Sequence, residues 1–163
     1  MKIVKFSLIA LLCCGQSMAY ADEHKTTACS SQTSQSQPVN ANLLVENARA
    51  KSTIPGVKVS AGYLKLTNNS NQTMRFTGVK TNAAKYTEFH TMVMLDSKMT
   101  MRKVDEIEIK ANQSFEFKPN GYHLMFMGLN QRFESGESIT LTLIQDNGQT
   151  YEVQLPIVSM KSH

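Results

Sequence analysis

The segment from His90 to Met127 reads HTMVMLDSKMTMRKVDEIEIKANQSFEFKPNGYHLMFM, and it holds two of the four histidines and six of the ten methionines of this 163-residue chain. Successive side chains of a β-strand point to opposite faces of the sheet, so residues two apart share a face. The segment therefore predicts three strands that each present imidazole or thioether groups on one side. The alternating residues are His90, Met92 and Met94, then Met99 and Met101, then His123, Met125 and Met127.

A site made of such side chains would suit one metal ion in particular. Thioether sulfur is soft and uncharged and selects Cu(I), whereas Zn²⁺ prefers thiolate or further imidazole, and Mg²⁺ and Ca²⁺ prefer oxygen. A methionine-rich strand face more often packs in a core than binds a metal, so packing is the alternative. The step His-x-Met occurs twice, at His90 and at His123, and this repetition favours a metal site.

The spacing of four of these residues resembles that of a known family. His90, Met101, His123 and Met125 follow the pattern H-x10-M-x21-H-x-M, which is the signature of the periplasmic copper chaperones called PCuAC proteins. The runs AGYLKLTN, MTMRKVDEIEI and GYHLMFMGL in and around the pattern are also similar to that family. The resemblance extends from about Leu43 to Ile157.

This resemblance implies a fold, a ligand set and a function. The family has a cupredoxin-like Greek-key β-sandwich, holds Cu(I) on the four side chains of the pattern, and delivers the ion to copper-accepting proteins. The expected partners are a cytochrome c oxidase subunit or its assembly factors. Met99 is the reserve ligand because it shares a strand face with Met101. The remaining methionines of the segment could form a second layer of soft donors, shield the site from water or assist transfer to a partner, but we expect most of them to pack under the site.

Residues 1–21 are typical of a secretory signal peptide, with the charged start MKIVK, the apolar centre FSLIALLCCG and the cleavage site Ala19-Tyr20-Ala21. The apolar run is shorter than the roughly 20 residues that span a membrane, and no later segment is long enough. We therefore expect a soluble periplasmic protein with no membrane span. A lipid anchor at Cys13 or Cys14 is less favoured, because Leu or Cys precedes each of them rather than a small residue.

Residues 22–41 are rich in Ser, Thr and Gln, which predicts a disordered polar tail. Cleavage after Ala21 would place His24 third in the mature chain, where amine and imidazole nitrogens could form a square-planar Cu(II) site. A solvated histidine is the alternative. Cys29 would be the only cysteine left, so an internal disulfide is excluded. A bridge between chains, a copper thiolate and an incidental exposed thiol all remain open.

The chain from Leu43 onward has the pattern of a β-sandwich. Short segments alternate apolar and polar residues, most clearly in ITLTLIQ, and turn signals such as Asp146-Asn147-Gly148 separate them. We predict strands over 43–51, 57–68, 74–80, 84–95, 99–110, 114–119, 122–129, 139–146 and 150–157. One domain over 42–158, followed by a tail over 159–163, accounts for the pattern.

Other function classes fit the sequence less well. A blue-copper electron carrier needs a Cys thiolate beside two histidines, and Cys29 lies in the polar tail. No GxSxG, HExxH, CxxC or Gly-rich phosphate loop is present, so we predict that the chain is not an enzyme. Without Lys2 and Lys5 of the leader, 15 basic and 13 acidic residues leave a net charge of +2, too weak to favour nucleic acid. A secreted adhesion or assembly module without metal is the main alternative.

Overall fold

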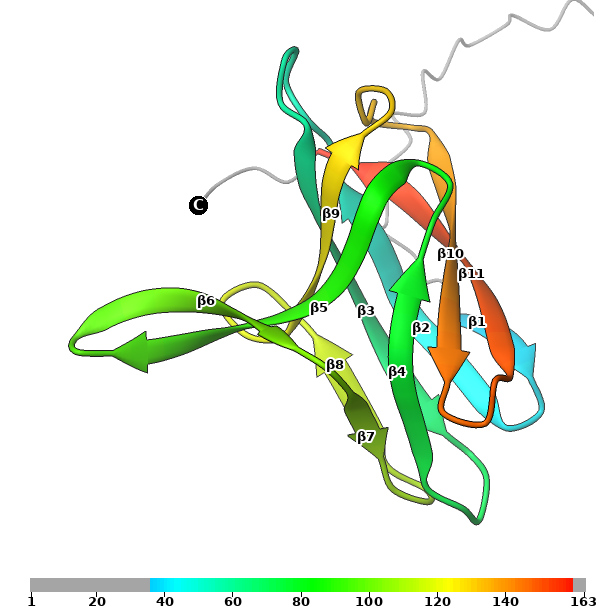
Figure 1. Ribbon diagram of the computed structural model, residues 1–163. Helices are drawn as coiled ribbons and strands as arrows, with labels where there is room; N and C mark the ends of the chain where they lie inside the picture. The colour runs from blue at the N-terminus through cyan, green and yellow to red at the C-terminus, as the bar shows by residue number, and fades with distance from the viewer. Residues whose placement is uncertain (1–35, 160–163) are drawn as a thin grey trace, which may run out of the picture. The chain divides into compact units, whose positions relative to one another are not determined.

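The described part of the chain is built from β-strands. The structure is a computed structural model that describes residues 36–159, and these residues form eleven strands and no helix (Figure 1). No helix that could cross a membrane is found among them. The strands are β1 (Ser36–Asn40), β2 (Leu43–Lys51), β3 (Val59–Asn68), β4 (Met74–Lys80), β5 (Ala84–Leu95), β6 (Lys98–Val104), β7 (Ile107–Ile109), β8 (Ser114–Phe117), β9 (His123–Leu129), β10 (Ser138–Gln145) and β11 (Thr150–Val158).

The strands form two layers, and β11 links them. One layer contains β1, β2, β3, β5, β6, β8 and β9, and the other contains β4, β7, β10 and β11. β11 pairs antiparallel with β10 along most of its length, but it meets β2 in parallel only at Ile157 and Val158. Strands distant in sequence lie side by side, as β9 does between β3 and β5. The predicted all-β Greek-key sandwich is confirmed.

Alternation along the strands places the core between the layers. In β10, Ile139, Leu141 and Leu143 are buried, whereas Thr140 between them is exposed. Burial of such apolar surface is the main stabilising contribution to a fold of this kind. The largest fully buried side chains are the aromatic rings of Phe76, Phe117, Phe126 and Phe133.

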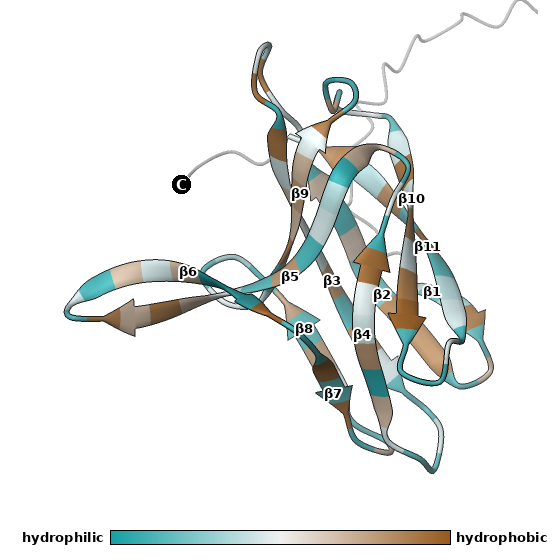
Figure 2. Ribbon diagram, in the orientation of Figure 1, coloured by the Kyte–Doolittle hydropathy of each residue, from teal (hydrophilic) through white to brown (hydrophobic). Residues whose placement is uncertain are grey.

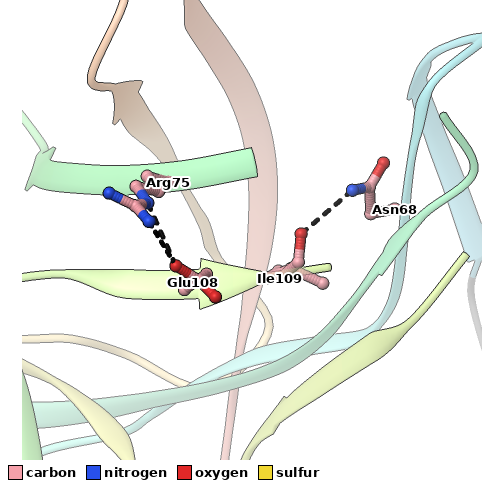
Figure 3. A network of polar contacts seen from close by, with 4 residues as sticks. All are labelled: Asn68, Arg75, Glu108 and Ile109. Carbon is pink, nitrogen blue, oxygen red and sulfur yellow. Dashed lines mark hydrogen bonds and ion pairs between the residues drawn. The ribbon is translucent and has the colours of Figure 1, made fainter. Parts of the chain in front are cut away.

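The predicted strand over residues 99–110 divides into two strands, because β6 pairs with β5 whereas β7 pairs with β4 of the other layer. The other predicted strands are confirmed to within two residues at each end. Arg75 of β4 and Glu108 of β7 are register partners. Glu108 Oε2 accepts a hydrogen bond of 3.0 Å from Arg75 Nε and lies 2.8 Å from Nη2 (Figure 3).

A buried asparagine joins β3 to β7 and to the loop before β4. Asn68 Nδ2 donates hydrogen bonds to the carbonyl oxygens of Gln72, at 2.7 Å, and Ile109, at 3.0 Å. Figure 3 shows the second of these bonds. The side-chain oxygen of Asn68 accepts from the backbone and hydroxyl of Ser70. Asn68 thus supplies partners for backbone groups where the strands diverge.

One prediction is wrong at the start of the domain. The polar tail was expected to reach residue 41, yet Ser36–Asn40 forms β1 and pairs with β2. The side-chain amide of Gln37 joins β1 to β11 as a backbone peptide group would. Its Nε2 donates to Gln154 O at 3.0 Å, and its Oε1 accepts from Gln154 N at 3.2 Å. The predicted leader, His24 and Cys29 all lie outside the described residues, as does most of the predicted C-terminal tail.

The hairpin of β5 and β6 extends beyond the rest of its layer. β5 pairs with β9 only from Ala84 to His90. Beyond His90, Met92 N donates to Gly121 O in the loop before β9, and the only paired strand is β6. Asp96 and Ser97 turn the chain with φ of 47° and 63°, the positive values that a tight hairpin turn requires. In Figure 1 this hairpin projects away from β9, and Figure 2 shows apolar residues at the end of β5 within it.

Candidate metal site

The four predicted site residues share one face of the sheet. His90 of β5 lies directly opposite His123 of β9, and Met101 of β6 lies opposite Met92 of β5. Met125 follows His123 by two residues, so it points to the same side. Cross-strand partners also point to the same side, and no irregularity interrupts the pairing of β5 with β6 or β9. The sheet therefore brings the predicted imidazoles and thioethers together.

The two imidazole rings lie close to each other. Their centroids are 6.0 Å apart and their planes are inclined by 48°. His123 is buried, with 6% of its surface exposed. Its Nδ1 donates a hydrogen bond of 3.0 Å to the carbonyl oxygen of Gly121, so in the neutral ring the lone pair lies on Nε2. The backbone before β9 thereby fixes which nitrogen of His123 can bind a metal ion.

His90 is oriented by a carboxylate. Its Nε2 lies 2.9 Å from Glu88 Oε2, and the neutral ring that donates this bond carries its lone pair on Nδ1. His90 Nδ1 is buried and has no hydrogen-bond partner among residues 36–159. The hydrogen bond from His90, followed by contact with Lys103, lowers the pKa of Glu88 below its ordinary value. The carboxylate therefore stays ionised and holds the Nε2 proton of His90 in place.

A pocket of about 520 Å³ opens beside these residues. Its lining includes Met92, Met101, His123 and Met125, but not His90. The remaining lining comes from residues 51–54, 57, 59–61, 63, 119 and 120, of which only Lys51 is charged. Among residues 36–159, no three His, Cys, Asp or Glu side chains are grouped as a metal site would require. The pocket thus offers imidazole nitrogen and thioether sulfur, and its lining contains no carboxylate or thiolate among the described residues.

The methionines of the hairpin are more exposed than the sequence suggested. Met101 is 43% exposed, Met99 51% and Met94 66%. The expectation of packing is wrong for Met94, because β6 is the edge strand and no other strand covers this part of β5. Met99, the predicted reserve ligand, does share a face with Met101, but its direct cross-strand partner is Met94.

Glu88 and Met92 belong to the site but were not among the predicted ligands. Both lie on β5 two residues from His90, and they therefore share its face. The run Glu-x-His-x-Met over residues 88–92 indicates that Glu88 and Met92 share a strand face with His90, because residues two apart in a strand point to the same side. What it lacked was the orientation of Glu88 toward the His90 ring, which depends on side-chain rotamers.

The fold and its imidazole–thioether face define a class: cupredoxin-like sandwiches of the PCuAC type. A family model described as "Putative lipoprotein LpqE-like" matches residues 43–157, and the chain belongs to this family. A relative described as "Putative lipoprotein Lxx21020", from Leifsonia xyli subsp. xyli, is 29% identical over 114 residues, which are 69% of this chain and 68% of the relative.

Solved structures share the fold. The copper-bound PCuAC domain from PmoF2 superposes with a TM-score of 0.63 at 15% identity, covering 77% of this chain and 99% of the domain. The solution structure of apo-DR1885 from Deinococcus radiodurans superposes with a TM-score of 0.59 at 24% identity. The match covers 90% of this chain and 97% of DR1885. The solution structure of CuI-DR1885 from the same organism superposes with a TM-score of 0.56 at 27% identity, and the match covers 77% of this chain and 81% of that protein. The predicted PCuAC-type family is confirmed, and proteins of this family are not enzymes, in agreement with the prediction from the sequence.

Proposed function

We propose that this protein binds Cu(I) with His90, Met101, His123 and Met125 and carries it to copper-accepting proteins. The observation that supports this most directly is the pairing of His90 with His123. Each ring uses one nitrogen in a hydrogen bond to the protein, and the other is left to donate its lone pair. Two such nitrogens beside the thioethers of Met101 and Met125 make a ligand set for a soft monovalent ion.

The ligand chemistry favours copper over other metals. No carboxylate lines the pocket among the described residues, so Mg²⁺ and Ca²⁺ find too few oxygens, and no thiolate is present there for Zn²⁺. The relatives agree, since the PmoF2 domain and the DR1885 protein are each described with copper bound, the latter with Cu(I).

A copper carrier must be able to release Cu(I) to an acceptor protein, and two features of the proposed site favour this release. Thioethers bind without a charge, and the 43% exposure of Met101 lets an acceptor approach the metal from the side of the pocket. A cytochrome c oxidase subunit or its assembly factors are the acceptors we propose. The leader over residues 1–21 would export the chain to the periplasm. The description of its relatives as lipoproteins supports export.

Anaerobic titration of Cu(I) against a chromophoric chelator tests the central claim. We expect the chain to compete for Cu(I), and X-ray absorption to count both nitrogen and sulfur neighbours. The His90→Ala/His123→Ala variant should lose most of this affinity, whereas Met127→Leu, on the same face but outside the pocket, should retain it. Wild-type affinity in the double variant would show that the ion binds elsewhere. Absence of Cu(I) binding in the parent chain would favour the metal-free adhesion or assembly module.

A second copper site at the mature N-terminus is a separate proposal. If cleavage follows Ala21, the amine and His24 would bind Cu(II) in a square plane. Titration of Cu(II) should then give a square-planar spectrum that His24→Ala abolishes. Identical spectra from both proteins would contradict it.

A further inference from the structure

The hairpin of β5 and β6 carries its methionines in pairs. Met94 lies directly opposite Met99, and Met92 lies directly opposite Met101. His90 is next along the same face of β5. Residues two apart on a strand are about 6.6–6.8 Å apart, so each pair is roughly that distance from the next. We call these two methionine pairs and the His90–His123 pair the ladder; its outer rung is Met94 with Met99.

Exposure falls along the ladder from the hairpin turn to the sandwich. The outer rung is more than half exposed at both residues, and Met101 of the next rung is 43% exposed. Met92 is half-buried, the His90 side chain is 13% exposed, and His123 is buried. Soft donors are thus present at every depth between the solvent and the buried imidazoles, and a donor or acceptor protein can reach the outer rung directly.

The charges of the hairpin lie mainly on its other face. Lys98 and Arg102 pair with Leu95 and Thr91, which alternate with the methionines and point the opposite way. Lys103, the cross-strand partner of His90, lies on the ladder face, and its Nζ is paired with Glu88 Oε1 at 3.3 Å. At the outer rung, a copper ion therefore meets the thioethers of Met94 and Met99, whose strand neighbours Leu95 and Lys98 point to the opposite face.

We propose that Met94 and Met99 form a second, weaker Cu(I) site through which copper enters and leaves the central site. This inference rests on the function proposed above. Two thioethers suffice to hold Cu(I) transiently, because soft sulfur is its preferred donor. Each methionine has three rotatable bonds, so its sulfur can move toward the next rung. The transfer replaces one sulfur donor by another; copper remains monovalent, and no proton is exchanged because thioethers carry none.

Methionine methyl groups provide the direct test. In protein labelled with ¹³C at the methionine methyls, the first equivalent of Cu(I) should shift the resonances of Met101 and Met125. Excess Cu(I) should then shift those of Met94 and Met99. The variant Met94→Leu/Met99→Leu keeps the volume and hydrophobicity of both exposed side chains while removing sulfur. It should bind one Cu(I) fewer, retain the affinity of the central site, and pass copper to a chelator several-fold more slowly in stopped flow.

Met127→Leu is the matched control, because it removes one thioether from the same face outside the ladder. It should leave both the stoichiometry and the transfer rate unchanged. If the resonances of Met94 and Met99 stay fixed at excess Cu(I), or the double variant transfers copper as fast as the parent, the outer site does not exist. The central site can still bind copper in that case. Failure of the proposed function has a different signature, since no methionine resonance would then shift.

Discussion

Glu88 should control copper affinity although it is not a ligand. Its Oε2 lies 2.9 Å from His90 Nε2, and its Oε1 lies 3.3 Å from Lys103 Nζ. The first contact fixes the Nε2 proton and leaves the lone pair on the buried Nδ1 of His90, which has no hydrogen-bond partner among residues 36–159. The second neutralises Lys103, which is the cross-strand partner of His90. The change Glu88→Ala removes both effects, so His90 gains rotational and tautomeric freedom and an uncompensated cation remains nearby.

The size of the effect follows from the exposure of the carboxylate. Partners that orient a metal-binding histidine typically change affinity by about 10–100-fold. The Glu88 side chain is 28% exposed, so water can replace part of its role, and we expect the lower end of that range. A loss of about tenfold corresponds to about 1.4 kcal/mol of binding free energy. Glu88→Gln can still accept from Nε2 through its amide oxygen and should lose less.

Chelator competition for Cu(I) measures this loss, and ¹⁵N chemical shifts of the His90 ring report the tautomer. Lys103→Ala is the matched control, because it removes the ion pair but keeps the bond from His90 to Glu88. The contribution of the carboxylate is present above its ordinary pKa of 4.5 and is lost only as the pH falls through the lowered pKa. The loss in Glu88→Ala should therefore be constant around neutral pH. Wild-type affinity together with an unchanged ring tautomer would refute the reasoning.

Three further changes test the packing and hydrogen bonding of the sandwich itself. A Cβ in Gly62→Ala would lie 2.8 Å from Cε2 of the buried Phe126 ring, so urea denaturation should show a loss of about 1–3 kcal/mol, and unchanged stability would contradict the packing. Asn68→Ala leaves the Ile109 carbonyl without this donor and should cost about 1–3 kcal/mol in the same assay, whereas Asn68 is dispensable if the loss is absent. Burial raises the pKa of Tyr151, so folding favours the neutral phenol, and stability should fall as the pH rises above 10.0. Tyr151→Phe should lessen this alkaline loss, and identical pH profiles would exclude the effect.

The sequence alone was sufficient to predict most strands, and it supplied the ligand chemistry on which the proposed site rests. Alternation is a local property, so the pattern in HTMVML or HLMFM indicates both a strand and the residues that share one of its faces. Ligand preference is a property of the side chain, so imidazole with thioether favours Cu(I) in any fold. The family resemblance added the particular set of four residues, which local spacing could not have selected from among eight.

Only the tertiary structure decided which strands became neighbours. The pairing of β5 with β9, and the register that places His90 opposite His123, depend on hydrogen bonds between segments far apart in the chain. The same pairing ends at His90, and this leaves the outer methionines in an edge hairpin rather than in the core. A local pattern gives the face of a side chain but not whether another strand covers that face, and this is why the exposure of Met94 and Met99 was decided by the assembly of the sheet.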